Sequence, residues 1–194
     1  MAKWPNVPAV YGWLALDRRG QWLIKGERIA NPVVVDFIGR NYERDADGRW
    51  FFQNGPQRVF VSLDYAPFVF RVMNPVSAPL DLCSQTRVKP AALKGAYIDE
   101  NGAIVLDTDI GPGVVDDRDL DAVAAALLDA KGRQPDDDAL DVMIEFIQAG
   151  EDVPLWLEYA GARVKLAALQ SSEAPRRFGF DPRPAAPAGH PECT

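Results

Sequence analysis

The sequence predicts an α+β protein made of two similar hairpin–helix–strand units with mainly antiparallel sheets, packed together. Three observations predict this class. Short apolar runs are separated by turn residues, helix-type segments lie between those runs, and the second half of the chain repeats the pattern of the first. The 194 residues are 47% hydrophobic and 25% charged, as is usual for globular proteins. A chain of this length can bury a core without disulfides.

The first unit begins with a predicted hairpin. Apolar runs at residues 13–16 and 21–24 flank the turn sequence Asp-Arg-Arg-Gly at 17–20. Asp opens turns by bonding to the backbone, and Gly closes them where φ is positive. We therefore expect two short antiparallel strands here.

A helix is predicted to follow at Asn31-Pro32. Asn is a favourable N-cap, and Pro at the first helical position loses no hydrogen bond. One face of this helix is mostly apolar, with Val34, Phe37, Ile38 and Asn41 at helical spacing. We expect this face to pack on the core.

Strands are predicted after this helix at residues 50–52, 59–63 and 68–73. Turn residues at 45–48 precede the first of these strands, and Asn54-Gly55 indicates a hairpin before the second. The prolines at 75, 79 and 90 make residues 74–90 the expected linker between the halves, with a short strand at about 80–83.

The second unit is predicted from a repeat, in which residues 97–106 match residues 15–24 at an offset of 82. A helix capped by Asp116 or Asp117 follows, and its apolar positions take the places of the first helix's apolar positions. A further helix is expected at 137–148 and a last hairpin at 155–159 and 163–166. Both halves thus read hairpin, helix, strands, which favours a duplication.

These patterns divide the chain into a first unit at 1–90, a second, acidic unit at 91–170 and a Pro-rich tail at 171–194. The tail is expected to be extended, with Phe178 and Phe180 able to dock on the body. Residues beyond Phe180 are expected to add little to stability.

Several stretches together resemble a proteobacterial family of unknown function. They are residues 20–26, Ile29, Pro32, residues 44–50, residues 59–61 and residues 66–69. The resemblance covers about residues 12–72 well and is weaker over 91–170. It implies a two-part α+β fold of repeated hairpin-and-helix motifs and suggests a regulatory or signalling role. The residues that carry it are turn and core residues, so no catalytic position can be transferred.

The charge distribution argues against a nucleic-acid partner. Residues 1–90 carry 12 Lys and Arg against 8 Asp and Glu, whereas residues 91–194 carry 9 against 20. Phosphate binding relies on clustered basic residues, and the arginines of the first half are scattered. The apolar stretches are also shorter than the roughly 20 residues of a membrane span.

The two cysteines, Cys83 and Cys193, are expected to be reduced thiols of a cytoplasmic protein. The apolar stretch at 7–16 after Lys3 resembles a signal peptide. It contains Pro8, follows Pro5 and has no small-residue cleavage site, so a strand is the better prediction.

The sequence lacks the residues of most catalytic sites. Its one histidine, His190, lies in the tail, which argues against a Ser-His-Asp triad, a Cys-His dyad or a His-ligated metal. Phosphate-binding glycine motifs and Cys-x-x-Cys are absent as well. No cofactor and no metal site are predicted.

Carboxylates are the remaining candidates for chemistry. Six aspartates gather in one segment, at positions 107, 109, 116, 117, 119 and 121, and three more follow at 136–138. They allow a carboxylate-dependent hydrolase or a cation site. Helix capping and a solvated acidic face explain them more simply, and the spacing of a calcium loop is not met.

A ligand, if the protein binds one, is expected at the seam between the two units. Each unit has one apolar sheet face that its own helix cannot cover, so the units must pack together. The candidate lining residues are Trp22, Trp50, Phe52, Phe68, Trp156 and Tyr159, with Arg49 and Arg71 as polar anchors. The simpler alternative is that all these aromatic residues are core.

The resulting hypothesis is a non-enzymatic binding or regulatory module whose partner is a small molecule or a protein. The alternatives are the carboxylate-dependent hydrolase and a purely structural subunit, which would present a large apolar interface. The sequence leaves the oligomeric state open.

Overall fold

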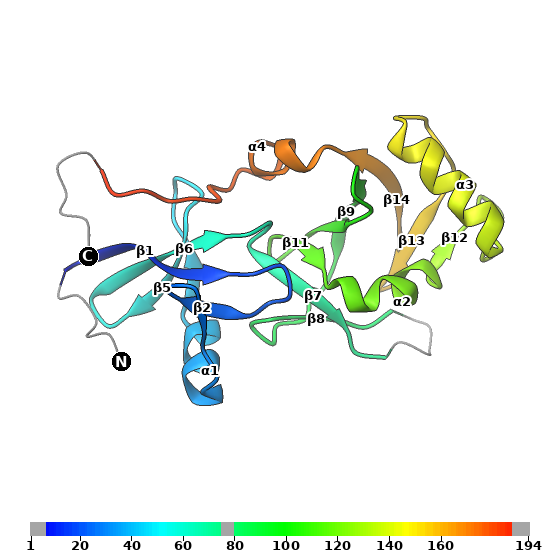
Figure 1. The fold of residues 1–194 in the computed structure, drawn as a ribbon. Coiled ribbons are helices and arrows are strands. Elements are labelled where there is room, and N and C mark those ends of the chain that lie inside the picture. The colour runs from blue at the N-terminus through cyan, green and yellow to red at the C-terminus, as the bar shows by residue number, and fades with distance from the viewer. Residues whose placement is uncertain (1–6, 75–79, 188–194) are drawn as a thin grey trace.

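The computed structural model describes residues 7–74 and 80–187 (Figure 1). The chain is a mixed α+β protein dominated by two sheets, with short helices around them. His190, Cys193 and part of the predicted linker, residues 75–79, lie outside the described residues.

The first sheet holds six described strands and occupies the left of Figure 1. They are β1 (Ala9–Leu16), β2 (Trp22–Ile24), β3 (Glu27–Arg28), β4 (Tyr42–Arg44), β5 (Trp50–Asn54) and β6 (Gln57–Leu63). Their order is β3-β2-β1-β6-β5-β4, and the central pair β1 and β6 is parallel. The predicted first hairpin is confirmed, with Leu14 opposite Ile24.

Helix α1 (Pro32–Arg40) connects β3 to β4 and begins as predicted, because the Asn31 side chain accepts a hydrogen bond from the Val33 backbone N–H. The prediction for its inner face was partly wrong. Ile38 is buried, but Phe37 is 41% exposed and Val34 is 38% exposed. The helix extends away from the sheet (Figure 1), so Phe37 touches the core at one edge, against Phe52.

The second sheet contains the remaining described strands. They are β7 (Phe68–Val72), β8 (Leu82–Ser84), β9 (Leu93–Asp99), β10 (Ile104–Thr108), β11 (Pro112–Val115), β12 (Leu127–Leu128), β13 (Trp156–Tyr159) and β14 (Ala162–Leu169). Their order is β12-β13-β14-β9-β10-β11-β7-β8. The pairs β7–β11 and β9–β14 are parallel. Both sheets are therefore mixed, although antiparallel pairs predominate among the described strands.

Strand β7, which the sequence places with the first half, joins the second sheet. Phe68 pairs with Gly113 and Phe70 with Val115, so β7 extends the edge formed by β11. The chain thus crosses between the sheets at residues 64–67, ahead of the predicted linker. Local patterns of apolar residues do not reveal such a parallel partner, because the pairing is made between segments far apart in sequence.

Four turns of the structure share one geometry. In each, an Asp side chain accepts hydrogen bonds from the backbone N–H groups two and four residues later, and a Gly three residues later has positive φ. The turns begin at Asp17, Asp45, Asp99 and Asp129. The first and third of them close the hairpins β1–β2 and β9–β10.

The helices of the second half follow the expected caps. The 3₁₀ helix η1 (Asp117–Asp119) is capped by Asp116 and leads into α2 (Leu120–Ala124). Helix α3 (Asp137–Gln148) is capped by Asp136 and buries Leu140 and Ile147. It lies at the far end of the molecule from the first sheet (Figure 1).

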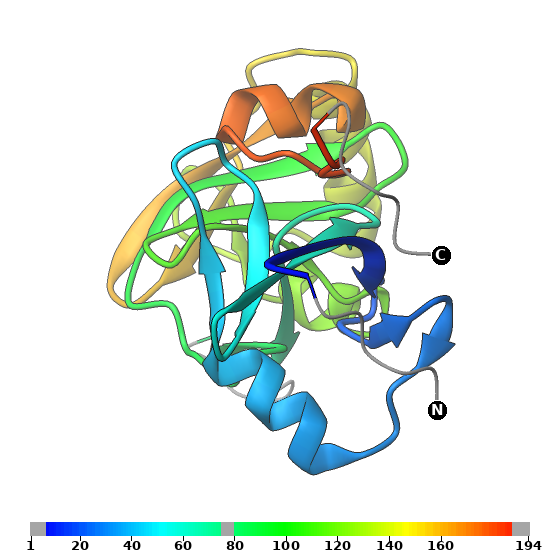
Figure 2. The same cartoon turned by 90° about the vertical axis from the view of Figure 1, so that its left-hand side faces the viewer.

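The C-terminal segment differs from the extended tail that the composition predicts. It forms η2 (Ser171–Glu173) and α4 (Ala174–Phe178), and then returns from the second sheet to the first (Figure 1). In the view of Figure 2, α4 lies above the strands and α1 lies below them.

Past α4 the segment is bound to the first sheet by its backbone. Asp181 N–H donates to the Gly48 carbonyl at 3.0 Å, and Leu63 N–H donates to the Pro182 carbonyl at 2.8 Å. Phe180 and Pro184 are buried. Residues 181–184 therefore contact the first sheet, whereas the sequence predicts a tail that adds little to stability beyond Phe180.

The buried apolar residues form one cluster that runs through both sheets and includes Phe180. Within residues 7–74 and 80–187, the helices are too short and too polar for any of them to span a bilayer.

Candidate functional site

Aromatic residues of the first half gather where the two sheets meet. The Tyr42 ring lies between Trp22 and Trp50, at centroid distances of 5.1 and 4.9 Å, and Phe68 packs edge-on against Trp50 at 5.0 Å. Across the seam, a Cβ atom added to Gly111 would lie 3.4 Å from the Trp50 ring. The predicted residues Trp22, Trp50 and Phe68 are thus brought together at the seam.

This cluster is packed as core. Trp22 and Trp50 are buried, and within the described part of the chain their indole N–H groups find no acceptor. Tyr42 donates its hydroxyl to the Pro67 carbonyl at 3.1 Å, and burial raises the pKa of this phenol well above its usual value. Tryptophan and tyrosine here contribute apolar area to the seam.

Beside this cluster lies a cavity of about 420 Å³, between the end of α1 and the second sheet. Its lining includes Tyr42, Phe68, Thr86, Val88 and Ile110. Helix α1 comes close here, because a Cβ on Gly39 would lie 3.3 Å from the Thr86 backbone. The described lining holds one charged side chain, Arg40, which pairs with Asp36 at 3.1 Å.

Phe52, on β5, is buried and packs against Phe37. The two predicted aromatic residues of the second half lie elsewhere. Trp156 is on β13, which β14, β9 and β10 separate from the seam strand β11, and its ring faces the Lys165 ammonium at 6.0 Å. Tyr159, on the same strand, donates its hydroxyl to the Pro90 carbonyl at 2.6 Å. The structure does not bring this pair to the Trp22–Trp50 cluster.

The two predicted arginine anchors serve as ion-pair partners. Arg49 contacts Asp45 at 2.7 Å and Asp47 at 2.9 Å inside one turn. Arg71 binds the carboxylate of Asp119 with two hydrogen bonds. Neither arginine lines a described cavity at the seam.

The acidic segment is less solvated than the sequence suggests. Asp116 is fully buried and pairs with Arg118, while Asp119 is nearly buried and also accepts from the Val72 N–H at 3.0 Å. Burial acts to raise the pKa of Asp116, but hydrogen bonds from Arg118 and the charges of Arg118 and Arg71 outweigh it and lower the pKa to about 2. These two carboxylates hold η1 against β7.

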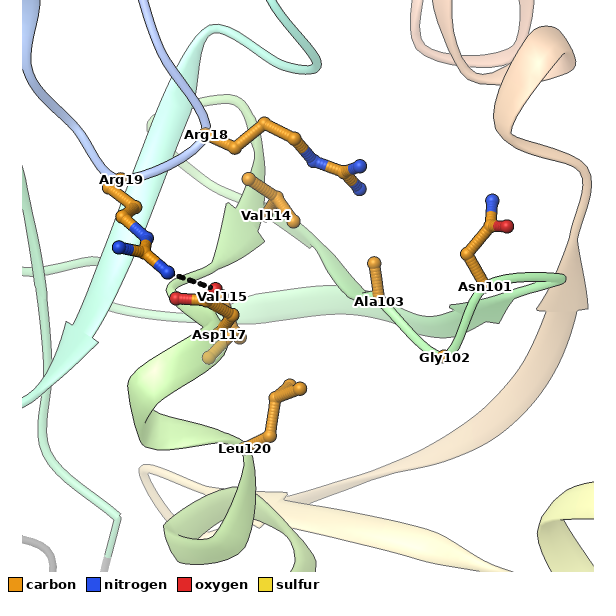
Figure 3. A pocket seen from close by; sticks show the side chains of 9 residues that line it. All are labelled: Arg18, Arg19, Asn101, Gly102, Ala103, Val114, Val115, Asp117 and Leu120. Carbon is orange, nitrogen blue, oxygen red and sulfur yellow. Dashed lines mark hydrogen bonds and ion pairs between the residues drawn. The ribbon is translucent and has the colours of Figure 1, made fainter.

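A second cavity opens at the seam, between the first and third of the four Asp-x-x-Gly turns (Figure 3). Its volume is about 330 Å³, and we call it the seam pocket. Its lining residues come from the β1–β2 turn, the β9–β10 turn, β11, η1 and the start of α2. They are Arg18, Arg19, Asn101, Gly102, Ala103, Val114, Val115, Asp117 and Leu120.

The two arginines of the seam pocket differ in their partners. Arg19 forms an ion pair with Asp117 at 2.8 Å. Arg18 forms none with any described acidic residue, and its guanidinium lies 4.6 Å from the centre of the Tyr65 ring. Figure 3 shows the Arg18 side chain extending across the pocket toward Asn101. The pocket therefore offers one guanidinium without a carboxylate partner.

Tyr65 connects this arginine to the β9–β10 turn. Its hydroxyl donates to the Asp99 carboxylate at 2.9 Å, and Asp99 is fully buried at the start of the β9–β10 turn. Burial and this hydrogen bond raise the pKa of Tyr65. The contact fixes the β9–β10 turn relative to Arg18.

The floor of the seam pocket is apolar, formed by Val114, Val115, Ala103 and Leu120. One carboxylate, Asp117, is found among its described lining residues. Among residues 7–74 and 80–187, no three His, Cys, Asp or Glu side chains are grouped closely enough to hold a metal ion. The arrangement fits binding of a small ligand with one anionic group and an apolar body.

Sequence reasoning missed the polar residues of this pocket. Arg18 and Asn101 occupy the middle positions of two matching turns, and that match was visible in the sequence repeat. What the repeat did not show was that the two turns face each other across the seam.

Comparisons with known proteins give a matching family model and two similar solved structures. A family model, DUF2944, described as "Protein of unknown function (DUF2946)", matches residues 1–185. No curated protein matches the chain.

Two solved structures of DUF1285 family proteins are similar. The one from Silicibacter pomeroyi DSS-3 has a TM-score of 0.48 at 15% identity and covers 89% of this chain and 93% of its own. The one from Shewanella baltica OS155 has a TM-score of 0.41 at 14% identity and covers 55% of this chain and 85% of its own.

Proposed function

The chain belongs to this family of proteins of unknown function, and from that premise we propose that it is a non-enzymatic binding module whose ligand occupies the seam pocket. The observation that carries the proposal is the pocket itself, which places an unpaired arginine over an apolar floor between two matching turns. Pockets with a few convergent polar groups on an apolar lining are typical small-molecule sites.

We further propose that the protein is built from two related units. The strand order β3-β2-β1-β6-β5-β4 has its counterpart in β11-β10-β9-β14-β13-β12, with a parallel central pair in each. A helix follows the third strand of each set, and each set contains two of the four Asp-x-x-Gly turns. Strands β7 and β8 then belong to the connection between the units.

The pocket at their junction supports a regulatory role. A ligand held there contacts the β1–β2 turn of one unit and the β9–β10 turn of the other. Its binding energy therefore opposes any movement of one unit against the other. A change in the relative position of the units is the signal that a partner protein would read.

The aromatic residues of the sequence-derived site have a supporting part in this proposal. Trp22, Trp50 and Phe68 stiffen the seam as core, and the ligand contacts are assigned to Arg18, Asn101, Val115 and Leu120. We place the protein in the cytoplasm, with Cys83 as a free thiol.

The carboxylate-dependent hydrolase is the weaker candidate. It needs two acidic side chains about 5–10 Å apart around a bound substrate. Asp117 is engaged by Arg19, while Asp116 and Asp119 are engaged by Arg118 and Arg71. These ion pairs leave the pocket with no available carboxylate pair among its described lining residues.

The test is a fragment screen on ¹⁵N-labelled protein by NMR. Hits are expected to shift the amide signals of Arg18, Gly102, Ala103 and Val115 together. Ala103→Leu fills the pocket and should abolish the shifts. The matched control is Ala162→Leu, an exposed alanine in another hairpin. Hits that shift other regions only, or hits that survive Ala103→Leu in a folded protein, would contradict the proposal.

A further inference from the structure

We infer that the ligand of the seam pocket is a small aliphatic monocarboxylate, with its carboxylate on Arg18 and its carbon chain on the apolar floor. The inference rests on the proposed function and names its ligand class. It follows from the charges, the geometry and the floor of the pocket.

The charge balance of the pocket calls for one negative charge. Arg19 is neutralised by Asp117, with which it forms a 2.8 Å ion pair. Arg18 has no ion pair with a described acidic residue and is stacked on the neutral Tyr65 ring. One guanidinium thus remains for one anionic group of the ligand.

The geometry favours a planar anion. A guanidinium presents parallel N–H donors that match the two oxygens of a carboxylate. The Tyr65 ring supports one face of the Arg18 guanidinium and limits its orientation. Asn101 lies across the pocket from Arg18 (Figure 3), so its side-chain amide can donate to the same carboxylate.

The apolar floor of the pocket determines the chemistry of the part of the ligand that does not contact Arg18. Val114 and Val115 are buried walls of β11, and Ala103 and Leu120 complete an apolar surface. A volume of about 330 Å³ is at the small end of ligand pockets. A short branched carbon chain fills this floor, whereas a sugar or a nucleotide would bury hydroxyl groups against valine and leucine without partners.

Phosphate groups and amines fit less well. A phosphate monoester carries nearly two negative charges, whereas the lining offers one guanidinium without a described carboxylate partner and also holds the carboxylate of Asp117. An ammonium group would need a carboxylate, and Asp117 is already held by Arg19.

The experiment titrates the full-length protein with three probes of one shape, 4-methylpentanoate, 4-methylpentanamide and 3-methylbutylamine, and with inorganic phosphate. Binding is followed by the amide shifts of Gly102, Ala103 and Val115. We expect saturable binding of 4-methylpentanoate at millimolar concentration. The amide, the amine and phosphate should bind about tenfold more weakly or not at all, because they lose a charged hydrogen bond or add an unmatched charge.

Two variants assign the contacts. Arg18→Gln should weaken 4-methylpentanoate about tenfold. The matched control, Arg28→Gln on the exposed strand β3, should leave its binding unchanged. Leu120→Ala should weaken 4-methylpentanoate several-fold and leave acetate unaffected, because acetate does not reach that wall.

The outcomes separate this inference from the function on which it rests. Equal binding of the acid and the amide, or no effect of Arg18→Gln, overturns the carboxylate inference and leaves the seam pocket as the site. If none of these probes moves the pocket signals while hits of the fragment screen do, the inference fails alone. If the fragment screen also gives no hits in the pocket, the carboxylate inference and the proposed function both fail.

Discussion

The Tyr65 hydroxyl donates a 2.9 Å hydrogen bond to the buried Asp99 carboxylate and so joins the segment after β6 to the β9–β10 turn. Asp99 also accepts the backbone N–H groups of Asn101 and Ala103 at 2.8 Å. One buried carboxylate therefore organises a turn of the second sheet and anchors a residue that leads out of the first. It therefore positions the β9–β10 turn, which lines one side of the seam pocket.

Removing this bond should destabilise the protein. Tyr65→Phe leaves a buried charged acceptor without one of its donors, and we expect a loss of about 1–3 kcal/mol in the free energy of unfolding by urea. Tyr11→Phe is the matched control, since Tyr11 stacks flat on Phe60 and its ring contact survives the change. A loss no larger than the control's would contradict the assigned role of the hydroxyl.

Asp116 should make stability depend on pH in the acid range. Its pKa is lowered to about 2, so the charged form stabilises the fold above the unfolded pKa, near 3.8, and this stabilisation is lost as pH falls toward 2. Asp116→Asn keeps a capping side chain and should cost about 1–2 kcal/mol at pH 7 and almost nothing at pH 2. Asp141→Asn, on the exposed side of α3, should cost little at either pH. Thermal unfolding measured across pH checks the costs of both variants. A cost of Asp116→Asn that does not change with pH would contradict the stabilising role of the Asp116 charge.

Substitution of Gly48 by alanine should destabilise the protein more than the positive φ of Gly48 alone would. Gly48 and Gly26 have nearly equal φ, 80° and 82°, but a Cβ on Gly48 would collide with the Gly179 carbonyl, whereas Gly26 faces open space. Gly26→Ala should therefore cost about 1–2 kcal/mol, which is the backbone penalty. Gly48→Ala should cost more. Chemical denaturation of the two variants measures the difference.

Removing the C-terminal segment tests whether the Gly179 carbonyl causes the extra cost of Gly48→Ala. Ending the chain after Phe178 removes the Gly179 carbonyl, the buried Phe180 and the backbone bonds of Asp181 and Pro182. We expect the melting temperature to fall by about 5–10 °C. In the truncated protein Gly48→Ala should cost no more than Gly26→Ala does. An unchanged melting temperature would show that the segment does not dock in solution.

The features that the sequence predicted are those decided by neighbouring residues. The Asp17 and Asp99 turns and the Asn31 cap each need an acceptor and a backbone N–H within four residues. Such contacts form in any chain with that local sequence. The hairpins and the helix at 137–148 follow for the same reason.

The features that it did not predict depend on contacts between distant segments. Strand β7 lies in the second sheet because it finds β11 as a parallel partner, which no local periodicity encodes. Phe37 remains partly exposed because α1 meets the core only near Phe52. Trp156 was assigned to the seam by its residue type, but its strand lies far along the second sheet.

The site itself was half predictable. The seam between the halves was the expected place, and it does hold a cavity. The polar residues of the pocket lie in turns. From the sequence alone, polar turn residues are equally well explained as exposed to solvent. Only the packing of one turn against the other distinguishes Arg18 from an ordinary surface arginine.

The return of the C-terminal segment to the first sheet has a consequence for synthesis. Arg44 and the Gly179 carbonyl that it binds are 135 residues apart. At about 5–20 residues per second, a ribosome delivers the second partner roughly 7–27 seconds after the first. Until then the β4–β5 turn lacks the hydrogen bonds that Arg44 and Gly48 make with residues 179–181. Chaperones that act during translation therefore have a defined interval in which to protect this half of the chain.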